Sequence, residues 1–251
     1  QEKYQAEYRP LIPNTVEIEF NNSEALQASF NDNVCAIILE PIQGEGGLTS
    51  ATAEFIAEIE RLAKTHQALV IFDEIQCGMS RTGTVLYSDQ LPLKADVVTL
   101  AKALGGGVPI GACITKGIAN EILVPGDHGS TYGGNPFVCS VAATVLDEIT
   151  SEEMLQHVTN MGQYARKSLE ALQKKHPEII EIRGEGLLLG FKLDDSLQAG
   201  DLVKEALARK LLLVSAGGNV VRYFPALIVT EKEIDATIPI LDAALSALKE
   251  A

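Results

Sequence analysis

The sequence predicts an α/β protein with a mostly parallel sheet, followed by a smaller α+β domain at the C-terminus. Short segments that are apolar throughout predict buried strands at residues 35–39, 69–72, 96–100 and 110–114. Between the first two, apolar residues recur at three- and four-residue spacing, which indicates a helix joining parallel strands. The residues on this helical face are Phe55, Ile56, Ile59, Leu62 and Ala63.

The other elements follow from the same patterns. Val16–Phe20 is expected to form an early strand, and after Pro136 the pattern changes to two long helices, at about 137–150 and 152–175. A compact α+β segment comes last, with strands at 186–193, 211–214 and 220–224 and helices at about 199–210 and 231–249. We therefore predict a large domain over residues 1–165 and a small C-terminal domain over residues 166–251.

Composition excludes several classes of protein. The chain has 251 residues, 46% of them hydrophobic and 22% charged, which suits an ordinary globular protein with a sizeable core. Its formal charge of −14 would repel nucleic acids and anionic membranes. No apolar run approaches the length of a membrane-spanning helix, and the cysteines and histidines show no disulfide or metal-ligand spacing. We expect a cytoplasmic protein that holds no metal.

A charged residue follows each of two predicted strands. Asp73 and Glu74 follow the strand at 69–72, and Lys102 follows the strand at 96–100. Because the carboxyl ends of parallel strands meet in one crevice of an open sheet, Asp73 and Lys102 are expected to share a site. Burial would turn a lysine without a counter-ion into a reactive amine, and a carboxylate suits a protonated ring nitrogen. This pair is the minimum that pyridoxal 5′-phosphate (PLP) chemistry requires.

Other motifs are weaker on their own. Asp73 also matches the magnesium-binding acid of P-loop nucleotide hydrolases, but the sequence contains no P-loop. Arg183–Gly190 imitates a dinucleotide fingerprint but leads into a predicted strand instead of a helix. Gly129–Pro136 offers hydroxyls and amides that can hold a phosphate, and Arg222 is either a surface residue or a carboxylate ligand. A metabolite-binding α/β module without catalytic activity is the alternative to an enzyme.

Four segments together resemble the class III (ornithine-type) PLP-dependent aminotransferases of fold type I, over nearly the whole chain. They are Glu40–Gly47, Phe72–Gly83, Ala101–Gly107 and His128–Pro136. Their combination in this order is far more specific than any one of them. The resemblance implies the fold of that group, PLP as the cofactor, and a homodimer with shared active sites.

The resemblance also implies roles for individual residues. Lys102 would form an imine with PLP and move the substrate proton, and Asp73 would keep the pyridine nitrogen protonated. Ile75 would pack on one face of the ring, and Gln76 would hydrogen-bond its phenolic oxygen. Two further residues are implied to bind the cofactor: Glu74, and Thr131, which would reach the phosphate bound in the neighbouring subunit.

On the substrate side, the resemblance implies that Ser130 lies close to the substrate and that Arg222 binds an α-carboxylate. Glu40 would pair with Arg222 when no carboxylate is present, so that one pocket accepts an ω-amino donor and then 2-oxoglutarate. The pattern favours N-acetylornithine as the amino donor, a reaction of arginine biosynthesis. Ornithine and 4-aminobutyrate are the alternative donors.

Members of this family carry further site residues upstream of the matched segments: a phosphate-binding loop, an aromatic residue that stacks on the ring, and a second substrate arginine. The sequence contains none of these. We therefore expect that roughly the N-terminal third of the enzyme is missing, and that the 251-residue chain alone binds PLP poorly and does not turn over.

Overall fold

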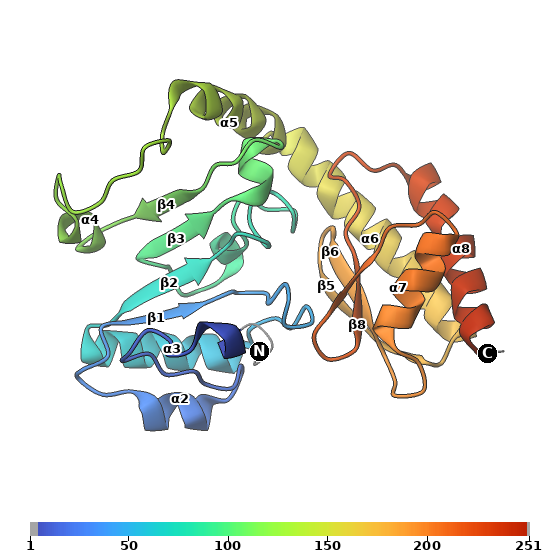
Figure 1. The fold of residues 1–251 in the computed structure, drawn as a ribbon, viewed down its shortest axis with the longest axis horizontal. Coiled ribbons are helices and arrows are strands. Elements are labelled where there is room, and N and C mark those ends of the chain that lie inside the picture. Colours follow the sequence, from blue (N-terminus) through green and yellow to red (C-terminus); the bar gives the residue numbers. More distant parts are fainter. Residues whose placement is uncertain (1–4, 250–251) are drawn as a thin grey trace.

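The computed structural model describes residues 5–249, which form two four-stranded sheets (Figure 1). The first sheet has the order β1-β2-β3-β4, where β1 is Ala36–Leu39, β2 is Leu69–Asp73, β3 is Val97–Leu100 and β4 is Ala112–Thr115. The strands β1, β2 and β3 run parallel, and β4 is antiparallel to β3. The predicted mostly parallel sheet is therefore confirmed.

The helix α3 (Ala53–His66) covers one side of this sheet (Figure 1). It connects β1 to β2, as the sequence predicted. The Thr52 hydroxyl caps the start of α3 by accepting a hydrogen bond from the Phe55 amide. The apolar face of α3 packs on the sheet together with Leu26 of the short helix α2 (Ser23–Ser29). All five residues predicted for this face are buried: Phe55, Ile56, Ile59, Leu62 and Ala63.

The early strand expected at Val16–Phe20 is wrong, because this segment pairs with no strand and has no regular structure. Ile18 and Phe20 instead pack against the core beneath α3, and the Phe20 ring meets the Phe55 ring edge to face at 5.7 Å. The alternating apolar residues of this segment therefore pack against the core without forming a strand.

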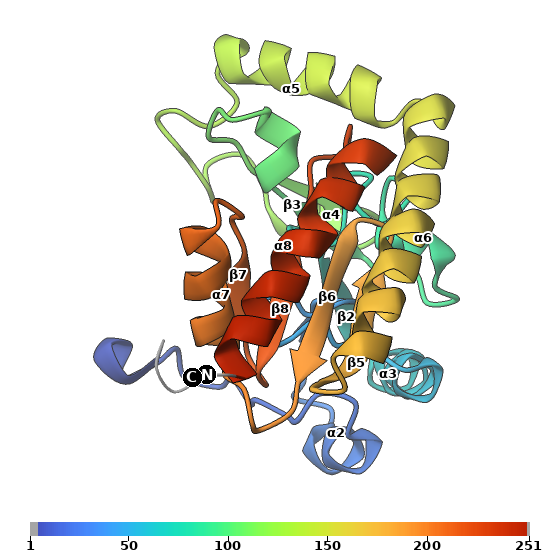
Figure 2. The same cartoon turned by 90° about the vertical axis from the view of Figure 1, so that its right-hand side faces the viewer.

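The second sheet is antiparallel, with the order β5-β6-β8-β7. The helices α6, α7 and α8 lie on one of its faces, and their apolar residues close a single core with it (Figure 2). The sequence missed β5, a strand with several charged residues, and placed β7 too early. The bounds are α6 Glu152–Lys175, β5 Ile179–Glu185, β6 Leu188–Leu193, α7 Ala199–Ala208, β7 Val214–Ala216, β8 Val220–Tyr223 and α8 Glu231–Lys249.

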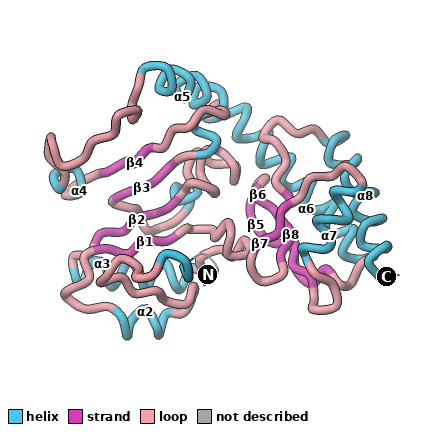
Figure 3. The backbone as a smooth tube through the Cα atoms, in the orientation of Figure 1, coloured by secondary structure: helices cyan, strands magenta, loops and turns pink. Residues whose placement is uncertain are grey.

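Two further helices connect the sheets: the short α4 (Ala119–Ile122) and α5 (Pro136–Ile149), which leads into α6. The domain division predicted at residue 165 falls inside α6, whose buried residues from Val158 onward belong to the core of the second sheet. Loops from both halves lie between the two sheets (Figure 3). Within residues 5–249, no helix combines the length and the hydrophobicity that a membrane-spanning segment requires.

Candidate active site

Asp73 and Lys102 leave the carboxyl ends of neighbouring parallel strands. Asp73 ends β2 and lies in register with Thr99 of β3, three residues before Lys102. The Oδ1 atom of Asp73 accepts hydrogen bonds from the Ile75 amide at 3.0 Å and from the Thr99 hydroxyl at 3.2 Å. These bonds orient the carboxylate. Its Oδ2 atom accepts no hydrogen bond from the described part of the chain.

Lys102 opens a 3-10 turn, Lys102–Gly105, and its backbone is left-handed with φ of 49°. This conformation costs a residue with a side chain about 1–2 kcal/mol, and such strain persists where the surrounding structure imposes it. The expectation that Lys102 is buried is wrong for this chain, because its side chain is exposed.

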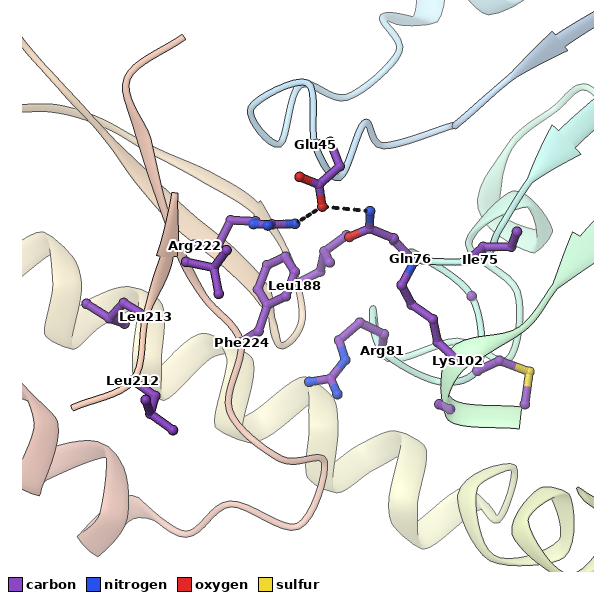
Figure 4. Close-up of a pocket in the computed structure, with 14 residues that line it drawn as sticks. Glu45, Ile75, Gln76, Arg81, Lys102, Leu188, Leu212, Leu213, Arg222 and Phe224 are labelled. Atoms are coloured by element: carbon purple, nitrogen blue, oxygen red, sulfur yellow. Dashed lines mark hydrogen bonds and ion pairs between the residues drawn. The ribbon is translucent and has the colours of Figure 1, made fainter. Parts of the chain in front are cut away.

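A pocket of about 560 Å³ lies between the two sheets and has Lys102 in its wall. The other side chains come from the loops after β1 and β2, from the turn that Lys102 opens, and from the second sheet (Figure 4). The second sheet contributes Leu188 of β6, the segment 212–214 that leads into β7, and Arg222 and Phe224 at the end of β8. Asp73 lies on the strand behind the wall and does not itself line the pocket. The polar and charged lining residues are Glu45, Gln76, Arg81, Lys102 and Arg222.

Arg222 pairs with Glu45, and not with Glu40 as the resemblance implied. Its Nη1 atom lies 2.5 Å from Glu45 Oε1, and the same oxygen accepts a hydrogen bond from Gln76 Nε2 at 3.5 Å (Figure 4). Arg222 is only 9% exposed, and its buried Nε atom has no hydrogen-bond partner in the described residues. Its Nη2 atom donates a weak hydrogen bond to the Ser215 carbonyl at 3.4 Å, and the side chain lines the pocket. A guanidinium in that position suits a carboxylate ligand.

Glu40 is turned back onto its own loop. Its Oε2 atom accepts a hydrogen bond from the Gly44 amide at 2.8 Å. Burial raises the pKa of the Glu40 carboxyl above its ordinary value; the Gly44 amide opposes this shift, Asp73 adds to it and Lys102 opposes it. Glu40 therefore lies within electrostatic range of both Asp73 and Lys102, but it does not line the pocket.

Glu74 also differs from its predicted role as a cofactor ligand. Its side chain is completely buried, and its carboxylate accepts hydrogen bonds from the amides of Tyr87 at 2.6 Å and Ser88 at 2.8 Å. Burial raises the pKa of Glu74, and the hydrogen bonds from Ser88 and Tyr87 partly offset this effect. Glu74 thus fixes the turn at residues 87–90 and does not contact the pocket.

Ser130 and Thr131 lie outside the pocket, on the exposed loop between α4 and α5. Ser130 Oγ accepts a hydrogen bond from the Gly133 amide at 3.0 Å. The structure therefore does not bring these two residues to Lys102 of the same chain. Their predicted contacts with a substrate and with a neighbouring subunit's cofactor remain predictions.

Arg81 is a second pocket residue, besides Glu45, that the sequence did not identify. It comes from the loop after β2 and donates a hydrogen bond to the Pro225 carbonyl at 2.6 Å. Burial lowers the pKa of the Arg81 guanidinium to about 10, so it stays charged at neutral pH. Nothing in the local sequence distinguishes it from a solvated arginine, because its contacts come from the second sheet.

The residues present fit the ring of PLP. Asp73 offers a free carboxylate oxygen for a ring nitrogen, and Lys102 offers an exposed amine at the pocket wall. Ile75 and Gln76 line the same wall and supply an apolar surface and an amide. Among residues 5–249, no group of three or more His, Cys, Asp or Glu side chains is placed to hold a metal ion.

Comparison with known proteins identifies relatives along almost the whole chain. The family model described as aminotransferase class-III matches residues 3–245. The chain is 43% identical over 249 residues to the acetylornithine aminotransferase of Caldanaerobacter subterraneus subsp. tengcongensis, an alignment that covers 99% of this chain and 63% of that protein. It is 42% identical over 250 residues to the acetylornithine aminotransferase of Vibrio vulnificus, with 99% and 62% covered.

Solved structures agree with this result. The N-acetylornithine aminotransferase from Stenotrophomonas maltophilia has a TM-score of 0.85 at 36% identity and covers 93% of this chain and 62% of that chain. The ornithine aminotransferase from Toxoplasma gondii has a TM-score of 0.91 at 32% identity and covers 100% and 60%. The chain therefore spans between 60% and 63% of the length of these relatives.

Proposed function

Because the chain belongs to the class III aminotransferases, we propose that the protein transfers an amino group from N-acetylornithine to 2-oxoglutarate, a step of arginine biosynthesis. The predicted family and fold are confirmed, and this family depends on PLP. The observation that carries the proposal is the pocket between the two sheets, where Lys102 lines one side and the Arg222–Glu45 pair lines the other.

Each residue of the site has a distinct task in this proposal. PLP, when bound, supplies an electron sink for the charge left on the substrate carbon that loses its proton. Asp73 Oδ2 would hold the proton on the ring nitrogen, and Lys102 Nζ would attach to the cofactor and then move the substrate proton as a general base. Ile75 and Gln76 would orient the ring from the loop after β2.

Glu45, in place of Glu40, would govern which substrates enter. An ω-amino donor presents its reacting amine without a carboxylate beside it, so the Glu45 carboxylate neutralises Arg222 while that donor reacts. The α-carboxylate of 2-oxoglutarate would displace Glu45 and bind Arg222 through two parallel hydrogen bonds. The 2.5 Å pair between Arg222 and Glu45 supports this role.

We further propose a cytoplasmic homodimer in which the loop that contains Ser130 and Thr131 reaches the active site of the partner. The exposed position of this loop supports the proposal, as does the exposure of its neighbours Tyr132 at 82% and Phe137 at 68%. The four free cysteines support a reducing compartment. Sedimentation of the complete protein as a monomer would contradict the shared site.

Initial rates with 2-oxoglutarate and three donors test the proposed reaction. N-acetylornithine is expected to give the highest kcat/KM, ahead of ornithine and 4-aminobutyrate. A higher value with either of the other donors would overturn the donor while leaving transamination in place. Binding of PLP to the complete protein without turnover of any donor would favour the metabolite-binding module instead.

Arg222→Met is expected to raise the KM for 2-oxoglutarate by roughly 10–100-fold, because a hydrogen bond to a charged group contributes about 1.5–3 kcal/mol. The KM for N-acetylornithine should change far less, because in the proposed donor complex Arg222 is paired with Glu45. Steady-state kinetics of both half-reactions measure this difference. Arg209→Met is the matched control, since Arg209 caps α7 and does not line the pocket.

A further inference from the structure

Arg81 joins the two halves of the molecule at the pocket. Its Nη1 atom donates to the Pro225 carbonyl at 2.6 Å and lies 3.5 Å from the Leu187 carbonyl. The backbone is joined at the same place, because the Leu187 amide donates to the Arg81 carbonyl at 3.0 Å. The loop after β2 is thus linked twice to the second sheet, at the turn before β6 and at the segment after β8.

The segment held by Arg81 lies directly beside Arg222. Strand β8 carries Arg222 and leads into Phe224 and Pro225. The centre of the Phe224 ring lies 5.5 Å from Arg222 Cζ, within cation–π range, and Figure 4 shows this ring between the two arginines. The hydrogen bond from Arg81 to Pro225 therefore fixes the aromatic surface on which the Arg222 guanidinium rests.

Stability alone does not explain this arginine. Arg81 forms no ion pair with any described carboxylate, and its hydrogen bonds go to neutral carbonyls. Arg81 is partly buried, and a cation withdrawn from water without a carboxylate partner is costly for the folded state. Because Arg81 lines the pocket despite this unfavourable contribution to folding, its position points to a role in ligand binding.

We propose that Arg81 is a positioning residue for carboxylate recognition: by holding Phe224 and Pro225, it sets the Arg222 guanidinium in the geometry that binds the substrate α-carboxylate. This inference rests on the proposed function, because it assumes that Arg222 receives that carboxylate. Arg81 acts through Arg222 and need not touch the substrate.

The test measures the dissociation constant of glutarate, a dicarboxylate that cannot react, by calorimetry on the complete protein loaded with PLP. Arg81→Met is expected to weaken glutarate binding by about tenfold, as for loss of one hydrogen bond to a charged group. The same substitution in an Arg222→Met background should have no further effect. The absorbance spectrum of bound PLP should remain as in the wild type.

The double substitution separates positioning from charge. If Arg81 only attracted the anion, its removal would weaken binding equally with and without Arg222, and the proposal would be overturned. Phe224→Leu, which keeps Arg81 but removes the ring beside the Arg222 guanidinium, serves if the methionine variant does not fold; full affinity in that variant would also overturn the proposal. A wild-type protein that does not bind glutarate would instead refute the proposed carboxylate site itself.

Discussion

Replacement of Lys102 by alanine in the complete protein is expected to lower kcat/KM for transamination by at least ~10²–10⁴-fold, the range for loss of a general acid–base group. The loss should exceed that range, because the same nitrogen is proposed to attach to the cofactor. Lys102 is exposed, so truncation of its side chain leaves no cavity in the core. Steady-state rates combined with a thermal unfolding curve distinguish lost chemistry from lost folding.

Lys116→Ala is the matched control, because Lys116 is an exposed lysine just beyond β4 and does not line the pocket. Its kinetic constants should remain at the wild-type level. Borohydride reduction followed by peptide mapping gives a second readout, with the pyridoxyl group expected on Lys102. An adduct on another lysine, or an active Lys102→Ala variant, would refute the assignment.

Asp73→Asn is expected to lower kcat on the order of 10²-fold, corresponding to about 3 kcal/mol for a charge-assisted hydrogen bond lost at the ring nitrogen. Asparagine keeps an oxygen that can accept from the Ile75 amide and the Thr99 hydroxyl, so the local backbone should be preserved. It has no negative charge to keep the ring nitrogen protonated. The chemical step should slow while the borohydride adduct on Lys102 still forms.

Single-turnover absorbance measurements isolate that chemical step from product release. Asp89→Asn removes an exposed carboxylate outside the pocket and should leave the rate unchanged. A wild-type rate in Asp73→Asn would mean that the proton on the ring nitrogen does not depend on this carboxylate, and the proposed cofactor orientation would then be wrong.

The sequence predicted correctly that Asp73 and Lys102 leave the carboxyl ends of two neighbouring parallel strands, because a local rule decides this position. Each follows an apolar strand, and parallel neighbouring strands end at the same edge of a sheet. The opposite positions of Asp73 and Glu74 follow from the two-residue alternation of side chains at a strand end. That alternation was available from the sequence and would have excluded Glu74 from the cofactor site.

The choice between Glu40 and Glu45 was not available from the sequence. Both lie in one loop, and which of them meets Arg222 depends on the path of that loop. The Gly217 amide, from the second sheet, donates to the Glu45 carbonyl at 2.9 Å and fixes that path. The role of Arg81 in the pocket could not be predicted for the same reason, since its hydrogen-bond partners lie more than a hundred residues away along the chain.

The left-handed backbone at Lys102 has a consequence for how this position responds to selection. Glycine adopts that conformation without steric cost, so the fold by itself favours its presence there. Selection for thermal stability alone should therefore favour variants with glycine at position 102. These variants should have a higher melting temperature and no transaminase activity. Thermal stability and catalytic activity therefore make opposite demands on the residue at position 102.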